Sequence, residues 1–259
     1  MDLSQSLSCD VIEEIYQTLL NYGVIFFRDQ TLSEEQHLDL GKLFGQLEIH
    51  PYSTANLPEH PEIIRLNNGP ESMKAIANHW HSDVTWREIP SLGSILLARE
   101  VPDIGGDTLF ANMEAAYYDL PNEIKEKLDG LIAIHDAPNF HERMRDKGAS
   151  KEEVEAIKNQ FPSVTHPVIR THPDTGRKSI YVCWGFTQTI VGMVTEESDA
   201  LLDYLYSRAA IPEYQVRFKW QKGSIAFWDN RTVQHYAVAD YWPNCRVMDR
   251  VTIIGDKPV

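Results

Sequence analysis

The chain has 259 residues, 42% of them hydrophobic and 24% charged, a composition that excludes a disordered, collagen-like or simple coiled-coil protein. Its 24 lysines and arginines stand against 38 aspartates and glutamates, so the formal net charge is −14. Such a surface repels phosphate backbones and anionic lipid headgroups, and we therefore expect no nucleic-acid partner and no membrane partner. The same charge argues at first against small anionic ligands.

The cysteines and the N-terminal sequence narrow the class further. Cys9, Cys183 and Cys245 are widely spaced and form no CxxC motif, which argues against a disulfide framework and a thiolate zinc site. The first residues lack the basic and apolar regions of a signal peptide, and no apolar run approaches the roughly 20 residues that span a bilayer. We expect a cytoplasmic protein that folds as one domain over residues 1–259.

The predicted elements place most helices in the first half of the chain and most strands in the second. Apolar residues at helical spacing before Gly23 predict a first helix, and Ser33 followed by acidic residues predicts the start of another. The predicted helices cover residues 11–22, 33–44, one or two pieces of 111–129, a stretch from about 150, and 197–209. The predicted strands cover residues 23–28, 63–66, 93–98, 167–170, 179–182, 214–220, 224–228, 233–238 and 246–254.

Short strands at this spacing predict a mainly β fold with helical decoration, a β-sandwich or jelly roll. Residues 67–79 are polar and contain Gly-Pro, so they predict a loop. Residues 137–165 are charged and weakly periodic, and they predict an insertion or lid.

Histidine and acidic residues two positions apart form the first candidate for a metal site. Ten histidines among 38 acids produce such pairs by chance, and the chain contains four: His37/Asp39, His60/Glu62, His81/Asp83 and His172/Asp174. The first lies in a predicted helix, where positions i and i+2 diverge, and the second and fourth lie in proline-containing turns. Only His81 and Asp83 have a setting compatible with a strand, in which both side chains point to one face and can bind one ion. The alternative is a half-buried histidine paired with a local acid.

A second histidine follows from the C-terminal part of the chain. The sequence Trp228-Asp-Asn-Arg predicts a turn that leads to His235 at the start of the next strand. With His81 and Asp83, His235 would complete a facial triad of two histidines and one carboxylate. That ligand set binds non-haem Fe(II) and leaves positions open for a cosubstrate and O₂.

The last predicted strand carries two arginines on one face. Strand alternation places Arg246 and Arg250 together and Asp249 on the opposite face, where it cannot neutralise both. Either this strand is an exposed edge, or the two guanidiniums are anion-binding groups, because burying them without anionic partners is costly.

Four motifs in this order resemble the taurine/2,4-D dioxygenase family of Fe(II)- and 2-oxoglutarate-dependent oxygenases. They are His81-Ser-Asp83 in its WHSDVTW context, Gly105-Gly-Asp-Thr108, Trp228-Asp-Asn-Arg with His235 behind it, and Arg246-x₃-Arg250. The resemblance runs from about residue 24 to residue 258. It implies a double-stranded β-helix, or jelly roll, and an oxidation in which 2-oxoglutarate and O₂ are consumed and succinate and CO₂ are formed.

The resemblance also implies roles for single residues. The facial triad matches the family's iron ligands. Thr108 and Arg246 match the groups that bind the C5 carboxylate of 2-oxoglutarate, and Trp228 is expected to line that pocket or to be plain core. Arg250 and His50 match the groups that bind the anionic end of the substrate in taurine-type members.

The chain departs from the taurine-type pattern at the amine end of the substrate. Those members have a tyrosine where this chain has Ser53 and an asparagine where it has Ala77. Tyr52 and Asn78 are the neighbouring residues that could replace them if the loop shifts. The resemblance therefore implies a small anionic organic substrate, with alkyl sulfonates and sulfate esters ranked first. Carboxylates such as aryloxyalkanoates or modified amino acids come second.

Two further functions and one assembly state remain to be weighed. A cupin-like metal-binding or sensor protein would turn nothing over and would not need Thr108 and Arg246. A hydrolase using the same triad would need a general base, and none is evident in the sequence. The resemblance leaves the oligomeric state open between a monomer and the homodimers or homotetramers that relatives often form.

Overall fold

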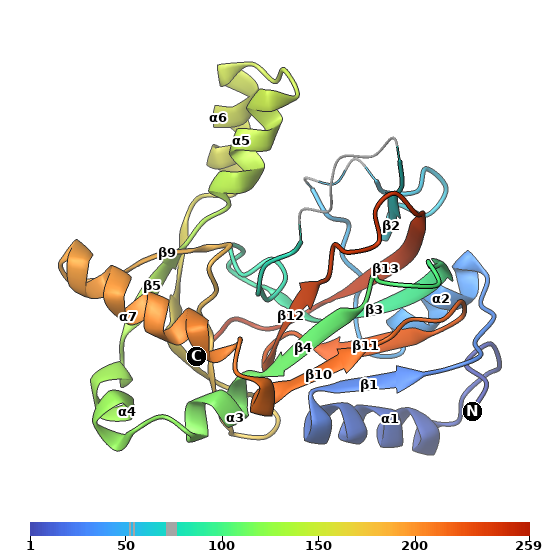
Figure 1. Ribbon diagram of the computed structural model, residues 1–259, viewed down its shortest axis with the longest axis horizontal. Coiled ribbons are helices and arrows are strands. Elements are labelled where there is room, and N and C mark those ends of the chain that lie inside the picture. The colour runs from blue at the N-terminus through green and yellow to red at the C-terminus, as the bar shows by residue number, and fades with distance from the viewer. Residues whose placement is uncertain (52, 54, 71–76) are drawn as a thin grey trace.

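The computed structural model describes residues 1–51, 53, 55–70 and 77–259 (Figure 1). Its helices are α1 (Cys9–Tyr22), α2 (Glu34–Lys42), α3 (Met113–Tyr118), α4 (Asn122–Leu128), α5 (Pro138–Asp146), α6 (Lys151–Gln160) and α7 (Thr195–Arg208), with a 3-10 turn η1 (Pro212–Tyr214). Its strands are β1 (Val24–Phe27), β2 (Ile63–Asn68), β3 (Ser91–Glu100), β4 (Thr108–Asn112), β5 (Ile132–His135), β6 (Val164–Pro167), β7 (Ile169–Thr171), β8 (Lys178–Ile180), β9 (Thr187–Ile190), β10 (Gln215–Phe218), β11 (Ile225–Asp229), β12 (Val233–Ala237) and β13 (Arg246–Ile254).

Antiparallel sheets dominate the architecture, as the sequence predicts. The largest sheet has the order β1-β11-β3-β13-β2, and a second sheet has the order β10-β4-β12. A buried cluster joins the two, with Leu96, Trp228 and Met248 from the large sheet packed against Phe110 and Phe218 from the small one. The mainly β fold with helical decoration is therefore confirmed at this level.

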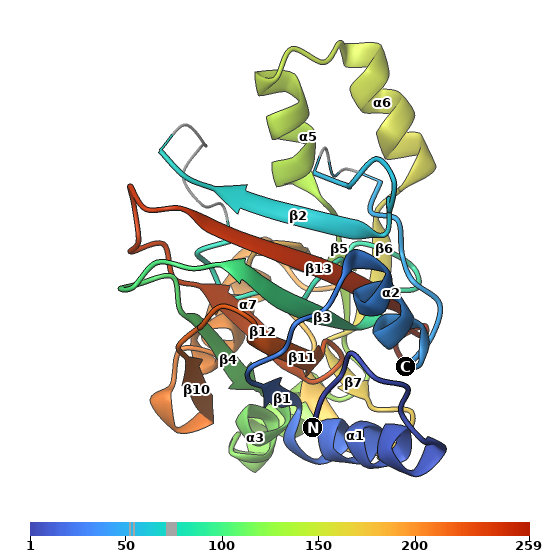
Figure 2. The ribbon, with the colours of Figure 1, turned by 90° about the vertical axis from the view of Figure 1, so that its right-hand side faces the viewer.

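The N-terminal helices cover the outer face of the large sheet, the face turned away from the small one. Leu19 of α1 and Leu38 of α2 belong to the same buried cluster as Ile95, Phe227 and Val251 of the sheet. In Figure 1 α1 runs beneath β1, and Figure 2 shows α1 and α2 along one side of the strands.

The ends of these helices follow the expected chemistry. The hydroxyl of Ser8 accepts a hydrogen bond from the backbone N–H of Val11 at the start of α1, and Gly23 ends that helix with φ 73°. Ser33 and Gln36 form a reciprocal capping box at the start of α2. These capping interactions fix where the chain enters and leaves both helices.

The segment 137–165 forms a pair of helices rather than one. The helix expected from about residue 150 is α6, capped by Ser150, and the preceding α5 was not expected. In both views the two helices project from the sheets as a hairpin (Figures 1 and 2). The sequence missed α5 because no side chain caps its start, although Pro138 stands at a position where proline favours a helix.

Strand β13 lies inside the large sheet, between β3 and β2, which excludes the alternative of an exposed edge strand. On its outer face the buried carboxylate of Asp249 accepts hydrogen bonds from Arg65 of β2, at 2.7 and 2.8 Å, and from Arg99 of β3, at 2.6 Å. These contacts tie three neighbouring strands together. Arg246 and Arg250 are left on the other face, as predicted.

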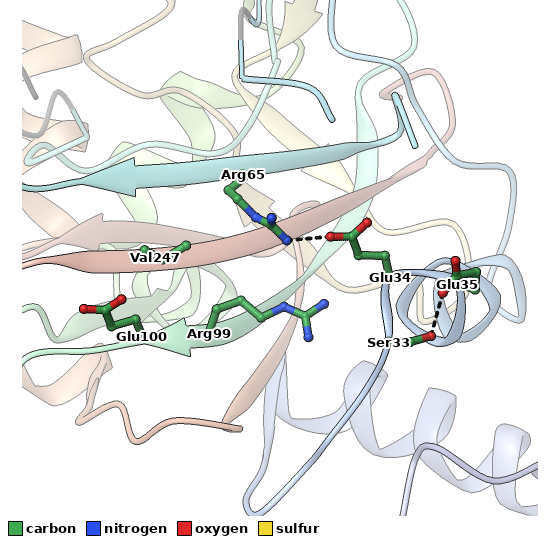
Figure 3. A pocket seen from close by; sticks show the side chains of 7 residues that line it. All are labelled: Ser33, Glu34, Glu35, Arg65, Arg99, Glu100 and Val247. Atoms are coloured by element: carbon green, nitrogen blue, oxygen red, sulfur yellow. Dashed lines mark hydrogen bonds and ion pairs between the residues drawn. The ribbon is translucent and has the colours of Figure 1, made fainter. Parts of the chain in front are cut away.

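A shallow depression borders this ion cluster beside the start of α2 (Figure 3). Figure 3 shows Arg65 directed toward Glu34, with the Arg99 side chain lying below it. Both guanidiniums are already engaged by Asp249, and glutamates line the rest of the depression. It is therefore a structural ion cluster rather than a candidate anion site.

None of the helices in the described part of the chain is both long enough and apolar enough to cross a bilayer.

Replacing Asp249 with Asn tests the ion cluster on the outer face. We expect the free energy of unfolding to fall by about 3 kcal/mol at pH 7, the lower end for a broken buried pair, because the two guanidiniums are partly exposed. Chemical denaturation followed by circular dichroism measures this loss. Lys257→Ala, which breaks an exposed pair with Glu88, is the control and should cost less than about 1 kcal/mol. Equal losses in the two variants would contradict the assignment.

The same variant has a defined pH dependence. Burial raises the pKa of Asp249, but the hydrogen bonds from Arg65 and Arg99 outweigh it and hold that pKa below the ordinary value of 3.8. A lowered pKa contributes stability above the unfolded value and loses it as the pH falls. The difference between wild type and Asp249→Asn should therefore be constant near neutrality and shrink below about pH 4.

Candidate metal centre and its cavity

Three side chains that the sequence analysis singled out converge on one point. His81, Asp83 and His235 are all buried, and each offers a ligand atom within 4.8 Å of the other two. The Nε2 atoms of His81 and His235 lie 3.9 and 4.0 Å from Oδ1 of Asp83. The set thus contains two imidazole nitrogens and one carboxylate oxygen around a common centre, which fits a divalent transition metal.

The backbone reaches this arrangement differently from the expectation. His81 and His235 form an isolated β-bridge with hydrogen bonds of 3.1 and 2.8 Å between their backbones. Asp83 does not continue a strand, because the chain turns there and Val84 has a left-handed φ of 49°. The prediction that one strand carries both His81 and Asp83 is wrong, although the two side chains do meet.

The turn between β11 and β12 holds the backbone of Asp83 in place, although Asp83 lies outside any strand. The side chain of Asn230 accepts a hydrogen bond from the Asp83 N–H at 2.6 Å and donates one to the Asp83 carbonyl at 2.8 Å. The Asn230 amide also donates a hydrogen bond to Ser91 Oγ, at 2.9 Å. Asn230 is fully buried and positions Asp83 from a point 147 residues away in the sequence. The sequence predicted a turn at this segment and a family motif, but no role for Asn230 itself.

Electrostatics keep the three ligands in the protonation states that a metal needs. Burial lowers the pKa of His81, and it lowers that of His235 to about 3, so both imidazoles are neutral at pH 7. Burial raises the pKa of Asp83, but the positive charge of Arg250 outweighs it and holds that pKa well below its usual range. Neutral histidines and an ionised carboxylate are the coordinating forms.

A cavity of about 310 Å³ opens beside the three ligands and contains Arg246 and Arg250 in its lining. Apolar side chains such as Leu66 and Phe186 form part of the wall. A concave, mostly apolar space with a few charged groups is typical of a small-molecule site.

Arg246 has a buried guanidinium nitrogen that no group in the described part of the chain satisfies. It is 4% exposed, its Nε donates to the carbonyl of Gly106 at 3.0 Å, and its Nη2 is buried without a hydrogen-bond partner in the described part of the chain. The hydroxyl of Thr108 accepts a hydrogen bond from Trp220 Nε1 at 3.0 Å, which leaves the Thr108 proton available for donation. A carboxylate would satisfy the unpaired Arg246 nitrogen.

Close packing also restricts what can stand beside Arg246. Gly106 has φ 72°, and a Cβ there would lie 3.1 Å from Arg246 Cδ. The ring centroids of Trp220 and Tyr241 each lie 5.9 Å from the guanidinium carbon. Trp220 was not predicted from the sequence, because its only signal is an aromatic residue after a short strand.

Arg250 is held next to the metal ligands. Its Nη1 donates to Asp83 Oδ1 at 2.9 Å, while its Nε is buried and has no hydrogen-bond partner among the described residues. His50 also lines the cavity, and burial lowers its pKa to about 4, so it is neutral at pH 7. Arg250 therefore supplies positive charge at this end, and His50 can supply a neutral hydrogen bond.

The remaining predicted site residues lie elsewhere. Trp228 is buried behind His235, with ring centroids 4.8 Å apart, and belongs to the core cluster between the sheets rather than to the cavity lining. Asn78 is exposed and lines a neighbouring groove, whereas Ser53 and Ala77 line the cavity. The prediction for Tyr52 falls outside the described residues.

Comparison with known proteins places these features in a family. The model of the family described as "Taurine catabolism dioxygenase TauD, TfdA family" matches residues 1–252. An alkylsulfatase of Acinetobacter baylyi is 34% identical over 98% of this chain and 80% of its own length. An alpha-ketoglutarate-dependent sulfate ester dioxygenase of Pseudomonas putida is 33% identical over 99% of this chain and 85% of its own.

A solved structure agrees with the sequence comparisons. The crystal structure of a taurine dioxygenase from Burkholderia xenovorans superposes with a TM-score of 0.84 at 34% identity, covering 100% of this chain and 85% of that one. The resemblance inferred from the motifs is thereby confirmed. The chain belongs to the taurine catabolism dioxygenase TauD, TfdA family.

Proposed function

We propose that this protein is an Fe(II)- and 2-oxoglutarate-dependent dioxygenase that hydroxylates a small anionic organic substrate, with alkyl sulfonates and sulfate esters first. The observation that carries the proposal is that His81 and Asp83, two of the three clustered metal-type ligands, line one cavity with Arg246, whose buried Nη2 has no partner among the described residues. The sulfate ester dioxygenase and alkylsulfatase among the relatives support the choice of substrate class.

The two facing sheets fit the expected architecture. The order of the large sheet, β1-β11-β3-β13-β2, combines strands from both ends of the chain, as two interleaved halves of a jelly roll do. We infer that the barrel is a double-stranded β-helix with the metal ligands at its open end.

The residues present fit both the metal and the cosubstrate. His81, Asp83 and His235 would hold Fe(II), and Arg246 with Thr108 would hold the C5 carboxylate of 2-oxoglutarate. Iron bound in this way supplies the activation of O₂ that is coupled to decarboxylation of 2-oxoglutarate to succinate and CO₂.

The protein's own contribution is placement. Arg250 binds the substrate anion through the side of its guanidinium that carries the unpaired Nε, while its Nη1 keeps Asp83 oriented. His50 donates a neutral hydrogen bond, and the apolar wall excludes water. Fixing the anionic end determines which C–H bond faces the metal. Where the oxidised carbon bears an ester oxygen or a sulfonate sulfur, the hydroxylated product collapses to an aldehyde and the free anion.

Carboxylate substrates are the second candidate, because a guanidinium binds a carboxylate in the same forked geometry. A non-catalytic sensor is disfavoured because Thr108 and Arg246 are both buried, and Arg246 lines the cavity with a nitrogen that has no partner among the described residues. Succinate release measured across alkyl sulfates, sulfonates and aryloxyalkanoates separates these candidates.

The metal assignment is tested by spectroscopy. Anaerobic addition of Fe(II) and 2-oxoglutarate should produce a weak visible charge-transfer band in the wild type, and His81→Ala should abolish it because one of three ligands is lost. His60→Ala removes a histidine from one of the rejected pairs and should leave the band intact. A band that survives in His81→Ala would overturn the assignment.

The two arginines should separate kinetically. Arg246→Gln should raise the KM for 2-oxoglutarate by about tenfold or more, and Arg250→Gln should do the same for the alkyl sulfate, since each removes a charged hydrogen bond worth about 1.5–3 kcal/mol. Iron content measured in parallel shows whether Arg250→Gln also disturbs Asp83. Identical kinetic changes in the two variants would refute the division of roles.

Asn230 should affect metal affinity by positioning Asp83. Asn230→Ala leaves the three ligands in place but removes both hydrogen bonds to the Asp83 backbone, and we expect metal affinity to fall by about 10- to 100-fold. Titration with Mn(II) followed by electron paramagnetic resonance measures it. Ser91→Ala, which removes only the outer contact of Asn230, should change the affinity little. Equal affinities for wild type and Asn230→Ala would exclude this positioning role.

A further inference from the structure

Helix α5 brings a third guanidinium to the cavity. Asn139, Phe140 and Arg143 all line it, and their spacing places them on one face of the helix. Figures 1 and 2 show α5 and α6 as the projecting hairpin, so this wall of the cavity comes from outside the sheets.

Arg143 is held in place by an aromatic ring rather than by an acid. Its guanidinium carbon lies 5.0 Å from the centroid of the Phe140 ring, and it makes no ion pair within the described ranges of the chain. The same Phe140 ring lies 5.8 Å from the ring of His50 and 6.3 Å from that of Phe186, both in the cavity wall. Arg143 is half-buried, and this burial lowers the pKa of its guanidinium. Its charge therefore faces the cavity mouth without an internal partner.

The acidic residues near Arg143 do not neutralise its charge on the side that lines the cavity. Glu142 and Asp146 lie on the same helix and line the outer groove that Arg143 also borders. Both are exposed to solvent, and neither lines the cavity itself. Solvent screens these carboxylates much more than it screens groups inside the cavity.

The charges inside the cavity favour a doubly negative substrate. Its described lining contains three guanidiniums, those of Arg143, Arg246 and Arg250, and one carboxylate, that of Asp83. The charges of Fe(II) and of 2-oxoglutarate cancel one another. Two positive charges then remain, and a monoanionic substrate neutralises only one of them.

We propose that Arg143 binds a second acidic group of the prime substrate, so that the preferred substrate is a dianion. Its first anionic group lies at Arg250, its second lies at Arg143, and a short carbon chain between them packs against apolar wall residues such as Leu66 and Phe186. A sulfonate or sulfate ester that also carries a carboxylate or second sulfonate has this chemistry. The inference rests on the proposed function for the position of the first group.

Isothermal titration with two probes of similar length tests the inference without turnover. The protein is supplied with Fe(II) and 2-oxoglutarate under anaerobic conditions and titrated with 1,3-propanedisulfonate and with 1-butanesulfonate. We expect the disulfonate to bind about tenfold more tightly in the wild type, as one additional charged hydrogen bond predicts. Arg143→Gln should remove this preference by weakening the disulfonate alone.

Arg145 offers a matched control on the same helix. It is exposed and does not line the cavity, so Arg145→Gln should keep the full preference. Arg143→Lys keeps the charge and should retain part of the preference, which distinguishes lost charge from a disturbed helix. Equal affinities for the two probes in the wild type, or an undiminished preference in Arg143→Gln, would overturn the inference.

Failure of the proposed oxygenase function and failure of the proposed role of Arg143 give different experimental results. If no sulfonate, sulfate ester or carboxylate stimulates succinate release, the oxygenase function fails whatever the titrations give. If succinate release is stimulated equally by monoanions and dianions and the titrations show no preference, the function stands and the role of Arg143 does not.

Discussion

The buried carboxylate of Asp229 organises the part of the molecule on which the site depends. It accepts hydrogen bonds from the backbone N–H, Nε and Nη2 of Arg231, at 2.9, 2.8 and 2.7 Å, and from His172 Nε2 at 3.0 Å. All three residues are at most 3% exposed. A buried charge is tolerated only when its hydrogen-bonding capacity is filled, and here it is filled by the turn that the carboxylate shapes. That turn places Asn230 against Asp83 and starts the strand that carries His235.

Strand β13 separates two kinds of charge on its two faces. On the outer face the carboxylate of Asp249 is neutralised by Arg65 and Arg99, so this acid needs no ligand. On the inner face Arg246 and Arg250 have buried nitrogen atoms without partners among the described residues. The net charge of −14 therefore describes the surface, whereas the cavity is locally positive. A strongly negative surface and a locally positive cavity coexist because solvent screens the surface charges far more than the buried ones.

The sequence predicted those parts of the fold that have a strong local pattern. Strands β11, β12 and β13 are apolar runs bounded by turns, and Arg246 and Arg250 share a face because alternation in a long strand is robust. The short strand β4, only five residues long, was missed, and so was α5. Neither has a capped or periodic sequence that local rules can detect.

The candidate site was predicted in its residue types but not in its geometry. His81 and Asp83 meet because Asn230 bonds to the backbone of Asp83 across 147 residues, and no periodicity within one segment contains that information. Trp220 and Arg143 were missed for the same reason, since their importance comes from what they contact. Conversely, Trp228 has the expected identity but lies behind His235 in the core.

The contact between Arg250 and Asp83 has a consequence for how the two halves of the site communicate. Oδ1 of Asp83 is the atom that both histidine Nε2 atoms approach, and Arg250 donates to that same oxygen. An anion that attracts Arg250 would therefore change the electron-donating capacity of the proposed metal ligand directly, with no moving domain between them. Linkage requires the effect to be reciprocal: the factor by which the anion changes metal affinity is the factor by which the metal changes anion affinity. One shared oxygen atom is enough to make the two equilibria cooperative.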